Sequence, residues 1–256
     1  MDLGLHDSVA LVTGGCRGIG RAIVALLRAE GARVVVADRD LALGEQLAAA
    51  DPGVVFVGGE LRDEAVCARA VATAAERFGR LDALVHNAGR NDGVGLDAGV
   101  AAFEASLRDN LVPAYALMHH ARGLLAQARG SVTLLGSKVA VTGQGGTSGY
   151  AAAKGGLLAL VREWAVELAP HGARSNAVLP AETWTPLYEE WLARQADPAG
   201  ERARIERTIP LGRRFTTPAE VAAAVVFLAS KHSSHTTGQI LFVDGGYTHL
   251  DRRCTS

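Results

Sequence analysis

The chain has 256 residues, 48% hydrophobic and 21% charged, which fits a globular protein with one α/β domain over residues 1–256. Its net charge of −1 argues against nucleic acid or an anionic membrane as a partner, because both require a basic face. The three cysteines lack C-x-x-C spacing, and we find neither a secretory signal nor an apolar run of about 18 residues, so we expect a cytoplasmic protein with reduced thiols.

Short β-branched runs alternate with alanine- and leucine-rich stretches along the chain. Strands are predicted at Val9–Thr13, Arg33–Ala37, Val54–Val57, Ala83–His86, Val132–Leu135, Arg174–Val178 and Gln239–Val243. Helices are predicted at Gly18–Glu30, Leu41–Ala50, Asp63–Phe78, Val100–Ala128, Tyr150–Ala169 and Pro218–Ser230. Most of the strands are apolar on both faces, which is typical of parallel strands covered by helices. This alternation predicts a doubly wound α/β sheet.

The segment Pro180–Pro210 departs from this alternation. It contains two short helical patterns, Pro186–Gln195 and Gly200–Arg207, separated by Asp197-Pro198. It is too helical for a disordered insert, and it adds no strand. We therefore expect a substrate loop or lid over about 180–210 within the single domain, with a plain surface excursion as the alternative.

A glycine cluster, Thr13-Gly-Gly-Cys-Arg-Gly-Ile-Gly20, lies between the first predicted strand and the first predicted helix. Glycine allows a tight turn there and lets the backbone approach a pyrophosphate closely. The N-terminus of the following helix offers free N–H groups and partial positive charge to the phosphates. The position of the cluster therefore favours a dinucleotide-binding loop over an ordinary turn.

Asp38 ends the second predicted strand, 18 residues after Gly20 (38 − 20). An acid at this distance can accept hydrogen bonds from the ribose hydroxyls of the adenosine and repels a 2′-phosphate, so NAD is favoured over NADP. Arg17 and Arg39 speak for the alternative, because either could pair with a 2′-phosphate. A further alternative is that Asp38 only caps the next helix.

Tyr150 and Lys154 lie four residues apart at the start of a predicted helix, so both side chains project from one side of it. An ammonium near a phenol stabilises the phenolate and lowers its pKa toward the range that base catalysis requires. Ser137 closely follows the strand Val132–Leu135, at the edge where open α/β sheets bind ligands. Together they predict a site for proton transfer to or from a carbonyl or alcohol oxygen.

The chain resembles the short-chain dehydrogenase/reductase family along nearly its whole length. The resemblance rests on Thr13–Gly20, His86-Asn-Ala-Gly89, Asn110, Ser137, Tyr150-x-x-x-Lys154, Asn176-Ala-Val-Leu-Pro180 and Val243-Asp-Gly-Gly246. It implies a single-domain Rossmann fold with a seven-stranded parallel sheet and helices on both faces. It also implies hydride transfer to a nicotinamide. The chain departs from the family pattern at Glu60, His86 and Ala181, and none of these removes a catalytic group.

The resemblance also implies a role for each matching residue. Tyr150 is the general base, Lys154 lowers its pKa and holds the nicotinamide ribose, Ser137 positions the substrate oxygen, and Asn110 anchors a water in the proton relay. The cofactor-binding residues that we expect, from residues and resemblance together, are Gly14, Arg17, Gly18, Ile19, Gly20, Asp38, Arg39, Glu60, Leu61, Asn87, Ala88, Gly89, Tyr150, Lys154, Pro180, Thr183 and Thr185.

The variable segments look like the bacterial L-fucose dehydrogenase branch of the family, which implies oxidation of the anomeric hydroxyl of L-fucose or a similar aldose to the lactone. A sugar requires several converging donors and acceptors. Glu182 could accept two sugar hydroxyls, or it could pair with a nearby arginine. The substrate residues that we expect are Arg90, Asn91, Ser137, Gln144, Tyr150, Glu182 and Tyr188.

Other readings remain open. The same family includes 3-oxoacyl-[acyl-carrier-protein] reductases and other sugar or alcohol dehydrogenases, and a non-catalytic nucleotide-sensing protein could use the same fold. His119 and His120 lack a third ligand at useful spacing, so no metal site is expected. The resemblance implies a homotetramer built through Val100–Ala128 and Tyr150–Ala169. The tail after Gly246 could then reach a neighbouring subunit's cleft.

Overall fold

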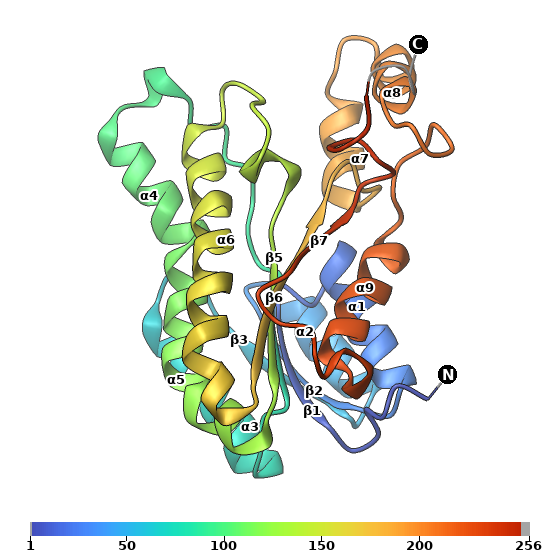
Figure 1. The fold of residues 1–256 in the computed structure, drawn as a ribbon. Helices are drawn as coiled ribbons and strands as arrows, with labels where there is room; N and C mark the ends of the chain where they lie inside the picture. Colours follow the sequence, from blue (N-terminus) through green and yellow to red (C-terminus); the bar gives the residue numbers. More distant parts are fainter. Residues whose placement is uncertain (1, 252–256) are drawn as a thin grey trace.

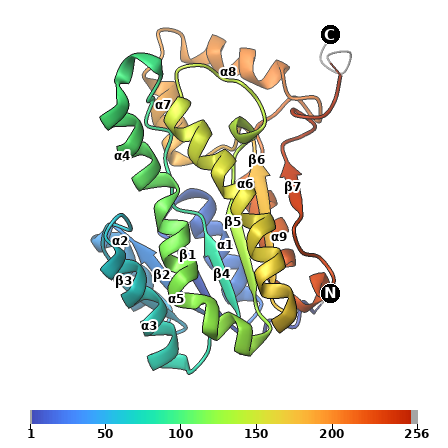
Figure 2. The ribbon, with the colours of Figure 1, turned by 60° about the vertical axis from the view of Figure 1, so that its left-hand side comes forward.

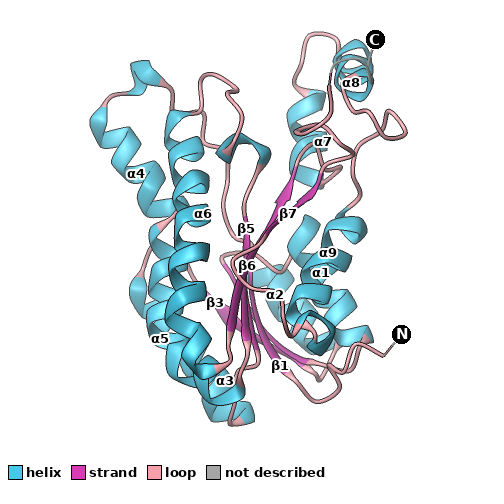
Figure 3. Ribbon diagram, viewed as in Figure 1, coloured by secondary structure: helices cyan, strands magenta, loops and turns pink. Residues whose placement is uncertain are grey.

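The protein is a three-layered α/β structure in a computed structural model that describes residues 2–251 (Figures 1 and 3). Seven parallel strands form one sheet in the order β3-β2-β1-β4-β5-β6-β7. The strands are β1 (Val9–Thr13), β2 (Arg33–Asp38), β3 (Val54–Gly58), β4 (Ala83–His86), β5 (Ser131–Leu135), β6 (Arg174–Pro180) and β7 (Ile240–Val243). The predicted doubly wound, seven-stranded sheet is therefore confirmed. Cys254 lies outside the described residues.

Helices cover both faces of the sheet, as Figures 1 and 2 show. The α-helices are α1 (Gly18–Ala29), α2 (Leu41–Ala50), α3 (Glu64–Phe78), α4 (Val100–Asn110), α5 (Val112–Ala128), α6 (Ser148–Leu168), α7 (Pro186–Ala193), α8 (Pro198–Arg207) and α9 (Pro218–Ala229). Short 3-10 helices occur at η1 (Leu96–Ala98), η2 (Lys138–Ala140), η3 (Ala169–His171) and η4 (Lys231–Ser233). Two hydrophobic cores result, one beneath α3, α5 and α6 and one beneath α1 and α9. The strands β1, β4, β5 and β6 are buried along their whole length.

The order of the strands places the site. β1 pairs with β2 on one side and with β4 on the other, so the direction of winding reverses between β1 and β4. At such a switch point the loops after the two strands diverge and leave a crevice at their carboxyl ends. The glycine cluster follows β1 and the segment 87–90 follows β4, so both lie at this crevice.

One predicted helix is wrong: Val100–Ala128 is two helices, α4 and α5. Leu111 has φ −122° and ψ −50° at the junction, and Pro113 lies in the first turn of α5. Proline has no N–H to donate to the carbonyl four residues before it, so a continuous helix is unfavourable here. The remaining predicted elements agree with the structure to within two residues at each end. The break places Asn110 at the carboxyl end of α4.

The segment after β6 forms α7 and α8, which lie beyond the carboxyl edge of the sheet together with the segment after β7 (Figures 1 and 2). A small third core anchors it, in which Ile205, Ile209 and Phe215 pack against Trp184 and Tyr188. The two helical patterns predicted in this segment, Pro186–Gln195 and Gly200–Arg207, are present as α7 and α8. None of the helices in residues 2–251 is both long enough and apolar enough to cross a membrane.

Candidate active site

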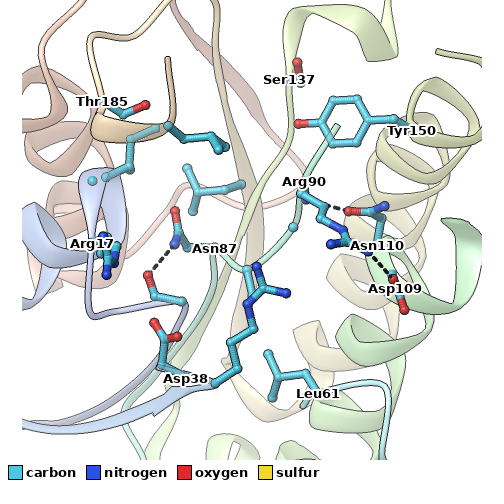
Figure 4. Close-up of a pocket in the computed structure, with 18 of the residues that line it drawn as sticks. Arg17, Asp38, Leu61, Asn87, Arg90, Asp109, Asn110, Ser137, Tyr150 and Thr185 are labelled. Atoms are coloured by element: carbon cyan, nitrogen blue, oxygen red, sulfur yellow. Dashed lines mark hydrogen bonds and ion pairs between the residues drawn. The ribbon is translucent and has the colours of Figure 1, made fainter. Parts of the chain in front are cut away.

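A cleft of about 650 Å³ runs along the carboxyl edge of the sheet. Figure 4 shows Asp38 and Leu61 at one end and Ser137 and Tyr150 at the other. Every predicted cofactor-binding residue lines this cleft except Gly20. A Cβ atom on Gly20 would collide with the carbonyl of Gly14, so this glycine serves the close packing of the loop on itself.

The loop after β1 is shaped for an anion. Gly14 has φ +64°, a conformation that favours glycine, and its N–H donates to the carbonyl of Ala37 at 2.8 Å. Gly18 opens α1, and the N-cap residue Arg17 makes no side-chain hydrogen bond to the first turn. The first N–H groups of a helix have no partner within it, so this uncapped end can bind phosphate. These features fit a dinucleotide.

The carboxylate of Asp38 is held by the backbone around it. One oxygen accepts from the Cys16 N–H at 3.0 Å and the other from the Asp40 N–H at 3.1 Å. The cap of α2 is Asp40, which accepts from the Leu43 N–H at 3.2 Å. The alternative that Asp38 is a helix cap is therefore wrong, and this carboxylate faces the cleft with its remaining lone pairs.

The two arginines near Asp38 have acidic partners. Arg17 donates two hydrogen bonds to one oxygen of Asp40, at 3.1 and 2.9 Å, and this pairing lowers the pKa of the Asp40 carboxyl. Arg39 lies 3.7 Å from the Glu60 carboxylate. Both cations are mostly exposed and partly neutralised, so neither is a dedicated phosphate ligand in this structure.

A buried network joins the loops after β1 and β4. The Thr13 hydroxyl oxygen accepts from the N–H groups of Asn87 and Ala88, each at 3.1 Å, and lies 3.1 Å from His86 Nδ1. Burial lowers the pKa of His86 to about 3, so its ring is neutral and accepts the Thr13 hydroxyl hydrogen. The Asn87 amide donates to the carbonyls of Thr13 and Gly14 at 3.1 and 3.0 Å. The two sides of the crevice are thus fixed together.

Tyr150 and Lys154 lie in the first turns of α6, and the Tyr150 side chain lies near Ser137, which follows β5 (Figure 4). Burial raises the pKa of Tyr150 to about 12, a hydrogen bond with Ser137 acts in the opposite direction, and the charge of Asp92 raises it further. Burial lowers the pKa of Lys154 to about 8. We expected Lys154 to lower the pKa of Tyr150. In this structure the loss of hydration on burial has the larger effect, and the pKa of Tyr150 is raised.

Lys154, Asn110 and Gly89 meet beside the tyrosine. The Lys154 ammonium donates to the carbonyl of Leu135 at 2.7 Å, and it lies 5.6 Å from the centre of the Tyr150 ring. The Asn110 side chain accepts from the Arg90 N–H at 2.8 Å. A Cβ atom on Gly89 would lie 3.1 Å from the Lys154 nitrogen and 3.2 Å from the Asn110 oxygen. Only a residue without a side chain fits comfortably there.

A second cavity of about 1010 Å³ opens on the far side of Tyr150, beneath α7 and α8. The predicted substrate residues line it without exception: Arg90, Asn91, Ser137, Gln144, Tyr150, Glu182 and Tyr188. Ser137 and Tyr150 also line the first cleft, so they stand at the junction of the two. The guanidinium of Arg90 lies 3.3 Å from the Asp109 carboxylate (Figure 4).

Sequence reasoning did not single out several residues that line the second cavity, among them Lys138, Asp92 and Tyr247. Lys138 forms an ion pair with Glu182, whereas the alternative to substrate contact that we considered for Glu182 was an ion pair with a nearby arginine. Asp92 has a buried carboxylate oxygen without a hydrogen-bond partner among the described residues. Tyr247 lies with its ring 4.1 Å from the Lys138 nitrogen. Lys138 and Asp92 adjoin predicted site residues, and this adjacency was the available signal; nothing local marks Tyr247.

Comparison with known proteins identifies the family. Residues 14–248 match the family model described as Enoyl-(Acyl carrier protein) reductase. The chain is 39% identical over 240 residues to L-fucose dehydrogenase of Mus musculus, covering 93% of this chain and 87% of that protein. It is 35% identical over 253 residues to L-rhamnose 1-dehydrogenase (NAD(P)(+)) of Azotobacter vinelandii, covering 94% and 97%. The resemblance to L-fucose dehydrogenases is confirmed, but those with this similarity are mammalian and not bacterial as we predicted.

Solved structures agree with this assignment. The fold matches the crystal structure of Cj0485 dehydrogenase with a TM-score of 0.94 at 38% identity, covering 98% of each chain. It matches the ligand-free aldohexose dehydrogenase of Thermoplasma acidophilum with a TM-score of 0.87 at 27% identity, covering 96% of each chain. The chain therefore belongs to the short-chain dehydrogenase/reductase family of NAD(P)-dependent oxidoreductases, which act on CH–OH groups.

Proposed function

We propose that this enzyme oxidises the anomeric hydroxyl of L-fucose or a stereochemically similar aldose to the lactone, with NAD as the hydride acceptor. The observation that carries the proposal is the position of Ser137 and Tyr150. They stand between a cleft with the features of a dinucleotide site and a polar cavity beneath α7 and α8. The similarity to L-fucose and L-rhamnose dehydrogenases supports a sugar as the occupant of that cavity.

The residues at the junction of the two cavities have different roles in the proposed oxidation. A nicotinamide dinucleotide held in the first cleft would supply the hydride acceptor and, in its oxidised form, a positive charge. The Ser137 hydroxyl holds the anomeric oxygen, and the Tyr150 phenolate accepts its proton. Since burial raises the pKa of Tyr150, the phenolate needs that positive charge together with Lys154. To Asn110, at the break between α4 and α5, we assign the role of anchoring the water that returns the proton to solvent.

The proposed preference for NAD rests on Asp38. Its carboxylate is fixed by two backbone N–H groups and is positioned to accept hydrogen bonds from the adenosine ribose. A 2′-phosphate in the same place would meet this negative charge. The charges of Arg17 and Arg39 are partly offset by Asp40 and Glu60, which weakens what they could offer a 2′-phosphate. NADP is therefore the weaker cofactor in this proposal.

A homotetramer remains part of the proposal. On α5 the side chain of Tyr115 is 58% exposed, and on α6 that of Val166 is 73% exposed. Val112 adds a further exposed apolar side chain on α5. Exposed apolar side chains on two long helices suit an interface between copies of the chain. We also propose a cytoplasmic location, in keeping with the free thiols of Cys16 and Cys67.

The test is an initial-rate panel with NAD and NADP. Candidate substrates are L-fucose, D-arabinose, L-galactose, D-glucose and 3-hydroxyacyl thioesters, and formation of NADH or NADPH is followed at neutral and alkaline pH. We expect the highest kcat/KM with L-fucose or one of its stereochemical relatives and NAD. Turnover of the thioesters without turnover of any sugar would overturn the proposal and favour a 3-oxoacyl thioester reductase.

A further inference from the structure

Lys138 is a buried cation of the second cavity that neither the family motifs nor the proposed proton transfer uses. It follows Ser137 directly, at the start of η2, and its side chain is only 11% exposed. Its ammonium pairs with one oxygen of Glu182, whose side chain is 16% exposed. The other Glu182 oxygen accepts from the Tyr188 hydroxyl at 2.9 Å. A buried lysine is thus placed beside the residue that holds the reacting oxygen.

The ammonium has bonding capacity to spare. It carries three N–H donors, and Glu182 is its only hydrogen-bond acceptor in the described part of the chain. The Tyr247 ring covers one further side, with its centre 4.1 Å from the nitrogen. Each Glu182 oxygen likewise keeps a lone pair after accepting one hydrogen bond. Both groups line the cavity, so their free donor and acceptor can reach a ligand in it.

Such an ion pair suits neutral hydroxyl groups. A sugar hydroxyl can accept from the ammonium and donate to the carboxylate, so two neighbouring hydroxyls can satisfy both charges at once. An anionic ligand would be attracted by Lys138 but repelled by the Glu182 carboxylate. A cationic ligand would be attracted by Glu182 but repelled by Lys138. The ring of Tyr247 and the hydroxyl of Tyr188 hold the pair in place on either side. The arrangement therefore favours a neutral polyol over a charged substrate.

We propose that Lys138 is a specificity-determining residue that, with Glu182, binds two adjacent ring hydroxyls of the aldose at positions away from the anomeric carbon. This inference rests on the proposed function, because it names the contacts of the same substrate. The rival explanation is that the ion pair only fastens η2 to the segment after β6. A purely structural role would weaken turnover of every substrate alike, and this difference makes the two explanations separable.

The experiment compares L-fucose with its 2-deoxy, 3-deoxy and 4-deoxy analogues in the wild type, Lys138→Met and Glu182→Gln. On the parent sugar we expect each variant to lose roughly 10- to 100-fold in kcat/KM, chiefly through KM, which corresponds to one charge-assisted hydrogen bond. On the analogue that lacks the contacted hydroxyl, the loss should shrink to less than about threefold. For each variant, one analogue should show the smallest loss in kcat/KM. The analogues identified in this way for Lys138→Met and Glu182→Gln should lack the same hydroxyl or hydroxyls on adjacent ring carbons.

The controls make failure informative. Lys231→Met removes an exposed lysine of η4, outside both cavities, and should leave every value unchanged. Lys138→Arg keeps the charge and should recover part of the lost kcat/KM. Equal losses on all four sugars, or a matching rise in the KM for NAD, would overturn the role of Lys138. If the wild type oxidises none of the sugars, the proposed function itself fails, and the two failures are thereby distinguished.

Discussion

Replacing Asp38 by alanine should reverse the cofactor preference of the enzyme. The carboxylate lies at the end of the cleft away from Ser137 and Tyr150 (Figure 4), the end that we assign to the adenosine. Two backbone N–H groups, at 3.0 and 3.1 Å, fix its position. Its removal deletes the acceptors for the ribose hydroxyls of NAD. It also deletes the negative charge that a 2′-phosphate would meet.

The size of the effect follows from these two contributions. Two unit charges about 4 Å apart interact by about 1 kcal/mol in water and about 4 kcal/mol at an effective dielectric constant near 20. For a half-buried carboxylate facing a phosphate we take about 2 kcal/mol, or roughly a 30-fold gain in kcat/KM for NADP. Loss of a hydrogen bond to a charged group costs NAD a similar amount. The NADP/NAD ratio should therefore rise by at least about 100-fold.

The assay is kcat/KM for each cofactor at saturating sugar, expressed as a ratio. The ratio is informative because any general distortion of the loop that carries Cys16 affects both cofactors equally. Asp40→Asn serves as the control, since it frees Arg17 while leaving Asp38 in place, and it should raise the ratio by less. An unchanged ratio in Asp38→Ala would refute the assignment of this carboxylate to the ribose.

Three further outcomes are expected. Tyr150→Phe should lower kcat by about 10²- to 10⁴-fold while leaving the Kd for NADH, measured by fluorescence titration, nearly unchanged; an active variant would exclude Tyr150 as the base. Asp92→Asn removes a charge that raises the pKa of Tyr150, so the rising limb of the pH–rate profile should move to lower pH, and a shift to higher pH would contradict this. Arg174→Met removes the buried hydrogen bonds that the guanidinium donates to the carbonyls of Leu228 and Ser230 and to the Ser233 hydroxyl, and it should destabilise the fold by about 2–4 kcal/mol in denaturant titration; a loss below about 0.5 kcal/mol would contradict this.

The sequence predicts the sheet well because parallel buried strands leave a strong local signal. Apolar runs such as Ala83–His86 have no polar face, and the helices between them are long enough to show periodicity. The phosphate loop is equally local, because its glycines and the helix that follows are contiguous. The prediction missed the break at Leu111 although Pro113 was a local signal for it, because the apolar periodicity continues on both sides of the proline.

The substrate cavity is harder to predict because its walls come from distant segments. The pairing of Lys138 with Glu182 joins η2 to the loop after β6, and no spacing rule connects them. The pKa values of Tyr150 and Lys154 depend on burial, which only the folded chain supplies. Motifs can therefore indicate which groups react, but they do not give the pKa values of those groups in the folded chain.

The adenosine end of the first cleft and the second cavity are built from different parts of the chain, as the position of Tyr247 illustrates. This separation bears on how such enzymes diversify. The adenosine end of the cleft is built from loops after β1, β2 and β3, in the first quarter of the chain. Residues from Gly89 onward make all the walls of the second cavity, and Tyr247, beyond β7, reaches back to its floor. Sequence drift in α8 and the segment after β7, which line the second cavity and not the first cleft, can thus alter the substrate cavity without disturbing the dinucleotide loop. A combinatorial library confined to those C-terminal segments would vary the walls of the substrate cavity and leave the cofactor-binding loop unchanged.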